Sequence, residues 1–316
     1  MSETVYAVVN PASAGGKTGR RWPELAAHLR RRVGELEVGF TEHSGHGIEL
    51  VQGALRRGIT HVVSVGGDGT LNEVVNGFFQ NGAPINPRAI LSLVPTGTGG
   101  DTRRSLGLPA DTLAAIEQVG ASPQATDVGR LTCVGADGQP LIRHFINIAS
   151  FGIGGLVDKL VNEGSKALGG KASFLWATLK AGVKYDNQAV RFRLDDGEPF
   201  ERTVLNGVVA NARYFGGGMH VAPTAKMGDG RFEVVVIGDM GFVQLTRNMP
   251  KLYKGEHLAL RDIEHFQATR VHAEPVQPDM HVLIDLDGEQ PGRLPATLEL
   301  LPGAIRLCRA PDAADD

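Results

Sequence analysis

Short apolar runs alternate with amphipathic segments along the N-terminal third of the chain. Four of these runs predict strands, at residues 4–9, 36–41, 62–65 and 89–94. Between them, apolar residues recur at helical spacing, as in Leu71, Val74, Val75, Phe78 and Phe79. Strands that alternate with helices favour a parallel sheet covered by helices on both faces. The pattern therefore predicts an α/β domain for residues 1–125.

The pattern changes after this region to short alternating segments, which predict a β-rich second domain over residues 126–296. Asp-Gly pairs divide these segments, and such pairs favour tight hairpin turns. They occur at Asp137-Gly138, Asp196-Gly197, Asp229-Gly230 and Asp287-Gly288. We therefore expect two domains of different architecture.

One segment of the second domain, residues 171–184, has helical periodicity. The stretch from residue 164 to 185 contains four lysines and no acidic residue, and Trp176 lies on the apolar face of the helix. Lysines and a tryptophan in this arrangement suit contact with anionic lipid headgroups. Such a helix equally suits packing on its own sheet, so both interpretations stay open.

Composition and charge exclude several classes of protein. The net charge of −3 argues against a surface built to bind nucleic acid. Cys133 and Cys308 lie far apart, which excludes a disulfide framework and a zinc motif. No apolar run approaches the roughly 20 residues that a membrane-spanning helix needs. We expect a cytoplasmic protein that contacts a membrane only peripherally, and we leave its oligomeric state open, a homodimer included.

Glycine-rich loops follow three of the predicted strands, at residues 10–18, 66–70 and 95–101. Glycines expose backbone N–H groups, and the helix that follows adds the positive end of its dipole, so each loop suits a phosphate. The carboxyl ends of parallel strands meet at one edge of a sheet, where ligands bind. We therefore expect the three loops to converge around a polyphosphate.

Two nucleotide motifs do not fit these loops. A Walker A loop needs glycine where this chain has Pro11, and the dinucleotide fingerprint needs glycine where it has Thr102. A mononucleotide polyphosphate therefore fits better than NAD. Lys17 and Arg20 either reach its phosphate oxygens or are solvated charges at the start of a helix.

Several aspartates are candidates for chemistry. Asp68, Asp101 and Asp127 lie in or after predicted strand ends, where their carboxylates could hold Mg²⁺ or could cap a helix or turn. Asp285 and Asp287 share one face of a predicted strand. Asp287-Gly288 also has the composition of a type I′ hairpin turn, so a purely structural role stays open for it.

Taken together, these stretches resemble the diacylglycerol kinase catalytic-domain family, which includes bacterial diacylglycerol kinases and the sphingosine and ceramide kinases. The matching segments run through nearly the whole chain: Asn10-Pro11 with Gly15-Gly16-Lys17, Gly66 to Glu73, Pro95 to Thr98 with Asp101, Asp127-Val128-Gly129, Asn147 to Gly155, Gly216 to Met219 with Ala222-Pro223, Asp229-Gly230, and Asp287-Gly288-Glu289. The resemblance implies an α/β domain similar to that of NAD kinases and phosphofructokinases, followed by a β-sandwich that takes the lipid. It also implies that residues 297–310 return to the first domain.

The resemblance implies ATP and Mg²⁺ as cofactors and assigns residues to three roles. The general base falls on Asp287, with Glu289 beside it. The nucleotide-binding residues are expected to be Asn10, Lys17, Arg20, Gly66, Gly67, Asp68, Gly69, Thr70, Glu73, Gly97, Thr98 and Asp101. The metal-binding residues are expected to be Asp68, Asp101, Asp127, Lys226, Asp229 and Arg231, with Lys226 and Arg231 contributing main-chain carbonyls.

The expected activity is transfer of the ATP γ-phosphoryl group to a hydroxyl of diacylglycerol or a related lipid at the inner face of the membrane. The alternatives are a ceramide or sphingoid base, phosphatidylglycerol, a soluble acceptor such as NAD, or nucleotide or lipid binding without catalysis. One departure from the family pattern bears on this choice, because Gly100 stands where the family usually has asparagine. The loss of that amide removes a donor and an acceptor near the nucleotide loop.

Overall fold

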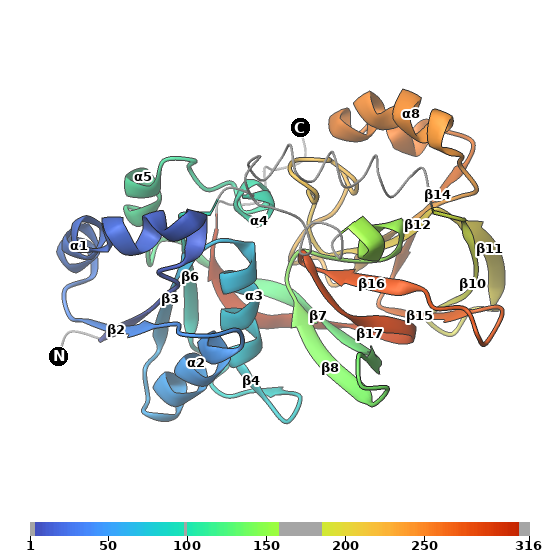
Figure 1. The fold of residues 1–316 in the computed structure, drawn as a ribbon. Helices are drawn as coiled ribbons and strands as arrows, with labels where there is room; N and C mark the ends of the chain where they lie inside the picture. Colours follow the sequence, from blue (N-terminus) through green and yellow to red (C-terminus); the bar gives the residue numbers. More distant parts are fainter. Residues whose placement is uncertain (1–3, 98–99, 158–184, 310–316) are drawn as a thin grey trace. The chain divides into compact units, whose positions relative to one another are not determined.

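A computed structural model describes residues 4–97, 100–157 and 185–309 of the chain. Its internal contacts divide the chain into two compact units. The first unit consists of residues 1–128 and 303–316, and the second of residues 129–302. The segment predicted to form a basic helix, residues 171–184, lies outside the described residues. Each unit is built around its own sheet structure (Figure 1).

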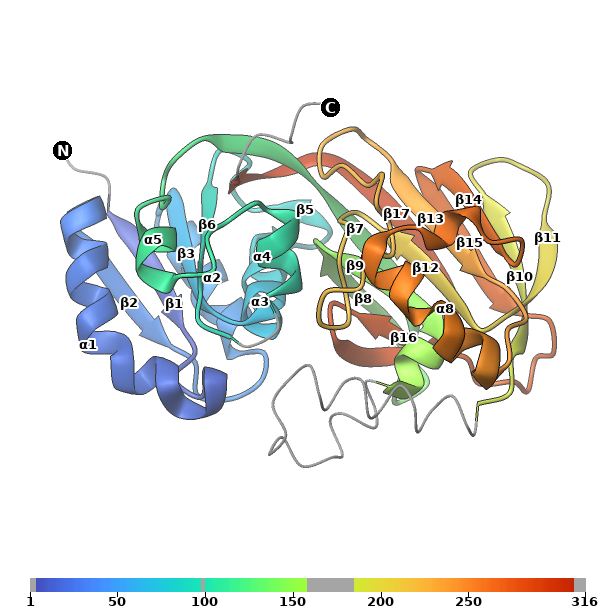
Figure 2. The same ribbon diagram turned by 90° about the horizontal axis from the view of Figure 1, so that it is seen from above.

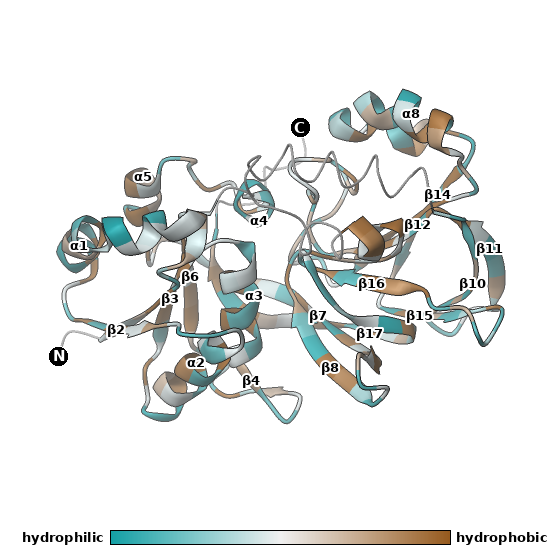
Figure 3. Ribbon diagram, in the orientation of Figure 1, coloured by the Kyte–Doolittle hydropathy of each residue, from teal (hydrophilic) through white to brown (hydrophobic). Residues whose placement is uncertain are grey.

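The first unit contains the predicted parallel sheet. Strands β1 (Val5–Val9), β2 (Leu36–Phe40), β3 (His61–Gly66) and β6 (Ile90–Pro95) pair in the order β6-β3-β1-β2, all parallel. The end of β17 (Glu289–Cys308) adds a further parallel strand beside β6, through Arg306 and Leu307. Strands β1 and β3 are fully buried, as parallel strands covered on both faces must be, whereas β2 is only partly buried. Figure 3 shows β3 and β6 in the hydrophobic colour.

Helices cover both faces of this sheet. Alternate residues of β1, namely Val5, Ala7 and Val9, pack with Leu25 and Leu29 of α1 (Ser13–Val33), and Ile116 of α5 (Thr112–Ile116) joins the same cluster. Helix α2 (His46–Arg56) contacts α3 (Asp68–Gly77), β1 contacts α2, and β3 contacts α3. The remaining elements are the short helix α4 (Asp101–Ser105) and the hairpin of β4 (Phe79–Gln80) and β5 (Ala83–Pro84). The prediction of an α/β architecture is confirmed.

The second unit is a β-sandwich of antiparallel strands. Its strands are β8 (Pro140–Phe145), β9 (Ile148–Gly152), β10 (Gln188–Leu194), β11 (Phe200–Val204), β12 (Asn206–Ala210), β13 (Phe232–Ile237), β14 (Ile263–Ala268), β15 (Arg270–Pro275), β16 (Leu283–Leu286) and most of β7 (Pro123–Gly135) and β17. One path of paired strands runs β14-β13-β12-β9-β16-β17, and β15 joins β17 to β10. The ring centroids of Phe151 in β9 and Phe192 in β10 lie 5.7 Å apart in the shared core, although these two strands do not pair. The alternating pattern of the sequence therefore gave the correct fold class for this unit.

The sequence pattern does not predict helix α8 (Phe242–Lys254), which is followed by the short 3₁₀ helix η2 (His257–Ala259). Pro250 lies inside α8, and an internal proline normally argues against a helix. Tertiary packing overrides that local preference, since Leu252 of α8 is buried in a cluster with Val208 of β12 and Val235 of β13. Figure 2 shows α8 over the strands of this unit. Among the described helices, none has the length and hydropathy needed to cross a membrane.

Two histidines are buried in a way that makes the fold sensitive to acid. His61, the first residue of β3, lies with Nε2 at 2.9 Å from Ser92 Oγ. Burial, with a smaller contribution from Arg32, lowers the pKa of His61 to about 4. Burial, Arg130 and Arg143 likewise lower the pKa of His144 to about 4. Between pH 6.5 and 4 the unfolded chain binds protons that the folded chain does not, so the free energy of unfolding falls as the pH falls through this window.

His61→Gln should remove one of these contributions. The loss of unfolding free energy between pH 7 and 4.5 should shrink by about 2 kcal/mol relative to the wild type. Urea unfolding at a series of pH values measures this loss. His281→Gln, at an exposed position, is the matched control and should leave the loss unchanged. An identical pH dependence in His61→Gln and the wild type would show that His61 is not the group responsible.

Candidate functional site

Side-chain hydrogen bonds join the three glycine loops at the carboxyl edge of the parallel sheet. Asn10, directly after β1, donates from Nδ2 to Thr70 Oγ1 at 3.1 Å. The Asn10 Oδ1 atom accepts from Ala12 N at 3.0 Å, which fixes the orientation of the amide. The backbone N–H of Thr96 donates to Gly66 O at 2.9 Å. The structure therefore places these loops together, as the sequence predicts for three successive strand ends.

Three hydroxyl groups connect the first loop to the third. Thr18 Oγ1 donates to Thr96 Oγ1 at 2.7 Å, and Ser13 Oγ lies 2.5 Å from Thr18 Oγ1 and 3.2 Å from Thr96 Oγ1. Thr18 is buried, whereas Ser13 and Thr96 are only half-buried. The cluster fixes the start of α1 against the end of β6. It also supplies hydroxyl groups of the kind that bind phosphate oxygens.

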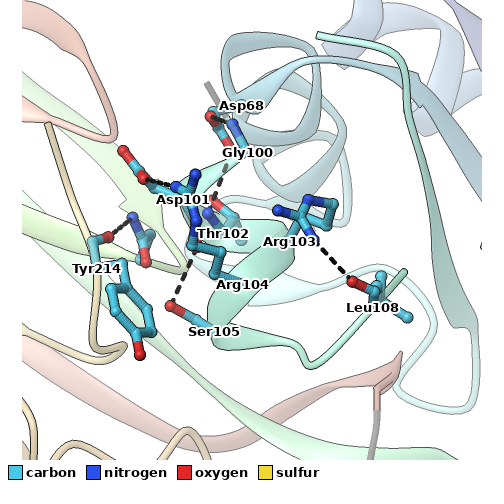
Figure 4. A network of polar contacts seen from close by, with 10 residues as sticks. Asp68, Gly100, Asp101, Thr102, Arg103, Arg104, Ser105, Leu108 and Tyr214 are labelled. Atoms are coloured by element: carbon cyan, nitrogen blue, oxygen red, sulfur yellow. Dashed lines mark hydrogen bonds and ion pairs between the residues drawn. The ribbon is translucent and has the colours of Figure 1, made fainter. Parts of the chain in front are cut away.

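Asp68 connects the second loop to the helix that follows the third (Figure 4). Its Oδ2 atom accepts from Gly100 N at 3.1 Å, and its Oδ1 atom accepts from Thr102 N at 3.4 Å. These two N–H groups belong to the start of α4, where backbone donors have no partner within the helix. Each carboxylate oxygen has a second lone pair, so Asp68 could hold a metal ion as well as the loop.

Asp101 is oriented by an ion pair within α4. Its Oδ1 atom accepts from Arg104 NH1 at 2.6 Å, and the Asp101 side chain is only 10% exposed. Arg103 points the other way and donates to Leu108 O at 2.9 Å (Figure 4). The carboxylates of Asp68 and Asp101 therefore belong to neighbouring segments of the same edge. Thr98 lies outside the described residues.

The glycines of the second and third loops lie in direct backbone contact. A Cβ atom added to Gly97 would lie 2.6 Å from the Cα atom of Gly67. A Cβ atom on Gly66 would lie 2.4 Å from Thr70 Oγ1. Both positions therefore leave no room for a side chain, and glycine lets the segments approach this closely. Gly69 continues this segment as the second residue of α3.

The first loop contributes positive charge. Ala14, Gly15 and Gly16 all have positive φ, so the regular part of α1 begins only after them. A Cβ atom on Gly15 would meet nothing within 4 Å. Lys17 is exposed, and the exposed Arg20 folds back with NH2 at 3.5 Å from Gly15 O. The open loop and its two cations fit an anionic ligand.

Two of the predicted site residues hold backbone elsewhere in the first unit. Glu73 accepts from Gly45 N at 2.8 Å and from Gly47 N at 2.9 Å, so its carboxylate caps the start of α2. Asp127 is buried and accepts from Gly303 N at 2.7 Å, which attaches the returning C-terminal segment. The prediction that Glu73 binds nucleotide and Asp127 binds metal therefore gains no support from these contacts and stays a prediction.

In the second unit, Asp287 lies in a hairpin turn between β16 and β17. Both Asp287 and Gly288 have positive φ, as a type I′ turn requires, and Leu286 pairs with Glu289 across it. The Asp287 carboxylate turns back toward the start of β9. Its Oδ1 atom accepts from the N–H groups of residues 147 and 148, at 3.1 and 2.9 Å, and its Oδ2 atom accepts from that of residue 146 at 3.2 Å. The backbone of Asp287 thus forms part of the turn, and its carboxylate is held in a fixed orientation.

The neighbouring residues reinforce this arrangement. Asp285 is buried and accepts from Ser150 Oγ at 3.1 Å and from Gly288 N at 2.9 Å. Asn147 donates from Nδ2 to Tyr214 O at 2.8 Å. Glu289 is exposed beside the turn. Ser150 of β9 thus contacts the end of β16 directly before the turn.

The loop predicted to bind a structural metal contains Lys226, Asp229 and Arg231. Asp229 is exposed and accepts from Arg231 N at 3.1 Å, as in an Asx turn. Arg231 donates from NH1 to Gln267 Oε1 at 3.1 Å. In the part of the chain that the structure describes, no three His, Cys, Asp or Glu side chains are grouped to hold a metal ion. The metal role of this loop stays a prediction.

Known proteins match both units of the chain. Residues 4–131 match the diacylglycerol kinase catalytic domain, and residues 147–309 match the YegS C-terminal NAD kinase beta sandwich-like domain. The chain belongs to the diacylglycerol kinase catalytic-domain family. The resemblance inferred from the sequence is therefore confirmed, and membership of a kinase family implies the use of ATP.

Relatives of this kinase match it over almost their whole length. It is 26% identical to a diacylglycerol kinase of Staphylococcus haemolyticus over 99% of this chain and 90% of the relative. It is 30% identical to a protein of Chromohalobacter salexigens named probable lipid kinase YegS-like, over 92% of this chain and 89% of the relative. A solved structure from Bacillus anthracis str. Sterne has the same fold, with a TM-score of 0.78 at 24% identity over 98% of this chain and 96% of that one.

Several residues that lie at the candidate site were not predicted from the sequence. The Ser13, Thr18 and Thr96 cluster was not predicted, although Thr18 ends the Walker-like segment and Thr96 precedes Gly97. Asn147 and the Asp285–Ser150 contact were not assigned roles in the sequence either. A hydroxyl or amide in a loop has no spacing pattern of its own. Only the fold shows that these residues meet.

The unusual glycine at position 100 also has a physical explanation. Gly100 has a φ of +71°, and glycine and asparagine are the residues that adopt this conformation most readily. A family asparagine and this glycine therefore suit the same backbone. The hydrogen bond from Gly100 N to the Asp68 carboxylate uses the backbone of residue 100 and does not depend on its side chain.

Gly100→Asn should accordingly be tolerated, whereas Gly100→Ala should destabilise the protein by about 1–2 kcal/mol, the cost of placing alanine at positive φ. Chemical denaturation of the two variants beside the wild type measures the difference. Equal stability of the alanine and asparagine variants would contradict the backbone explanation.

Gly97→Ala should be more damaging, because the new Cβ atom meets backbone that cannot move aside. We expect a loss of about 1–3 kcal/mol of stability, together with weaker ATP binding. Thermal unfolding with and without ATP measures both effects. The matched control is Gly53→Ala in α2, where a Cβ atom meets nothing within 4 Å and helix propensity should improve. Similar losses in the two variants would contradict the role of close backbone contact.

Proposed function

We propose that this protein is a lipid kinase that transfers the γ-phosphoryl group of ATP to a hydroxyl of diacylglycerol or a related lipid. The observation that carries the proposal is the match of both units, in one chain, to relatives named diacylglycerol kinase over about nine-tenths of their length. A nucleotide-binding domain alone would fit kinases of many acceptors. The match of the second unit to the YegS C-terminal NAD kinase beta sandwich-like domain supports a lipid kinase of this family.

The first unit supports the nucleotide half of the reaction. The half-buried backbone at Gly67 and Gly97 would receive phosphate oxygens, and the cations Lys17 and Arg20 would offset their charge. The carboxylates of Asp68 and Asp101 fit Mg²⁺, a hard cation that prefers oxygen ligands. When bound, Mg²⁺ supplies charge neutralisation at the phosphate oxygens.

The second unit supports the acceptor half. Three backbone N–H groups hold the Asp287 carboxylate in one orientation, and a base must be positioned in this way to take a proton from an attacking hydroxyl. Holding the carboxylate beforehand removes the need to order it during the reaction. Glu289, exposed beside the turn, would be a second acidic group near the acceptor.

The acceptor is tested directly by incubating the protein with labelled ATP and Mg²⁺ and a panel of acceptors. The panel contains vesicles with diacylglycerol, ceramide, sphingosine or phosphatidylglycerol, and NAD in solution. The proposal expects label in a lipid product, with diacylglycerol the best acceptor. Transfer of label to NAD alone would contradict the lipid kinase proposal and support the soluble-acceptor alternative. ATP binding without transfer of label to any acceptor would support a binding function without catalysis.

Asp287→Asn should abolish turnover, with a loss of at least about a hundredfold, because the amide cannot accept the hydroxyl proton. ATP binding, a property of the other unit, should persist. The matched control is Asp137→Asn, the same substitution in the Asp137-Gly138 turn, where Asp137 accepts from Gln139 N within the turn itself. Normal turnover in a folded Asp287→Asn variant would remove Asp287 from the role of base.

A further inference from the structure

Helix α8 presents two faces of opposite character. Its inner face consists of Leu245, Met249 and Leu252, which pack on the core of the sandwich unit. Its outer face consists of five exposed residues at helical spacing: Val243, Arg247, Pro250, Lys251 and Lys254. With 3.6 residues per turn, these five lie within one stripe about 100° wide, opposite the inner face. We call this stripe the basic face.

The basic face has a strong local charge. Its three cations, Arg247, Lys251 and Lys254, lie in a helix that contains no aspartate or glutamate. They form no ion pair with any residue in the described part of the chain. The chain as a whole has a net charge of −3, so this stripe departs from the average of the surface.

Nearby acids do not neutralise the basic face. Asp262 accepts from Gln244 at 2.5 Å, at the start of the helix, and Asp239 accepts from Asn187 at 2.7 Å. Glu256 is exposed beyond the C-terminal end of α8 and is the acid closest to Lys254 in sequence. In the described part of the chain, no acid therefore forms an ion pair with a cation in the middle or last turn of the helix.

Apolar groups are exposed on the same helix. Val243 is 78% exposed and Tyr253 is 41% exposed. Among the described residues only two other large apolar side chains are exposed to this degree, Phe40 and Ile142, and they lie elsewhere. A solvated helix face has no need for an exposed valine. Cations flanked by an aliphatic and an aromatic side chain suit the boundary between lipid headgroups and acyl chains.

We propose that the basic face of α8 docks on an anionic lipid bilayer. The inference rests on the proposed function, because an acceptor such as diacylglycerol is confined to a bilayer and its kinase has to meet that surface. The charge of the basic face complements anionic headgroups, and Val243 would enter the headgroup boundary. Attraction of basic residues to an anionic surface adds to the apolar contribution and weakens as salt rises.

The test uses vesicles of phosphatidylcholine, with or without phosphatidylglycerol, and measures bound protein by co-sedimentation. Wild-type protein should bind the anionic vesicles, bind the neutral ones weakly, and be released by salt. The triple variant Arg247→Gln, Lys251→Gln, Lys254→Gln should bind anionic vesicles on the order of a hundredfold more weakly, since each cation near such a surface is worth roughly a factor of five. Val243→Ser should weaken binding by about fivefold.

The matched control removes three exposed arginines from the other unit: Arg30→Gln, Arg31→Gln, Arg88→Gln. This control has the same net charge as the triple variant, so a large loss of binding in both would show a general charge effect and would overturn the proposal. Unchanged binding of the triple variant would overturn it too. If the wild type ignores vesicles while the triple variant changes its oligomeric state, the basic face is a contact between copies and the proposal is wrong.

Two readouts separate this proposal from the proposed function. Co-sedimentation needs no turnover, so docking can succeed in a protein that phosphorylates no lipid. Conversely, the triple variant should keep wild-type turnover of a short-chain diacylglycerol dispersed in detergent, where no bilayer is needed. Thermal unfolding confirms that it is folded. If the triple variant unfolds, the single variant Lys254→Gln at the exposed end of the helix takes its place, with an expected loss of about fivefold.

Discussion

The backbone contact between Gly67 and Gly97 is the constraint on which the candidate nucleotide site depends. The two segments approach so closely that a single Cβ atom at Gly97 would lie 2.6 Å from Gly67 Cα. The approach is possible because β3 and β6 are adjacent parallel strands in strict register, from His61 opposite Ile90 to Gly66 opposite Pro95. A parallel pair ends both strands at the same edge, so the loops that follow have to share one small space. Glycine is the residue that allows them to do so.

The acidic residues show a second common principle. Asp68, Glu73, Asp127 and Asp287 each accept backbone N–H groups from a segment far away in sequence. A carboxylate is well suited to this task, because it offers two oxygens and stabilises N–H groups that a loop leaves without partners. The carboxylates predicted to take part in chemistry therefore also organise the backbone. For Asp68 and Asp287, the contacts that organise the backbone also fix the carboxylate in one orientation.

Much of the architecture follows from the sequence, and the limits have physical causes. Buried strands such as β1 and β3 are visible because burial on both faces demands continuous apolar runs. The convergence of the loops follows from the parallel topology alone. Helix α8 escaped prediction because Pro250 is a local signal against a helix, whereas its stability comes from Leu245, Met249 and Leu252 packing on strands distant in sequence. The hydroxyl cluster of Ser13, Thr18 and Thr96 escaped for the same reason, since 78 residues separate Thr18 from Thr96.

The hairpin turn at Asp287-Gly288 shows how a structural and a chemical interpretation of the same residues can both hold. Asp287-Gly288 has the composition of a type I′ turn, and the positive φ values of both residues agree with it. A turn alone would be satisfied by asparagine, yet the carboxylate here accepts three N–H groups at the start of β9, and Asp285 beside it accepts Ser150 and Gly288. Asp285, at the end of β16, and Asp287, in the turn, are each surrounded by N–H or O–H donors that stabilise a carboxylate. These contacts go beyond what a hairpin turn requires, so the structural interpretation of Asp287 does not replace the prediction that its carboxylate acts as a base.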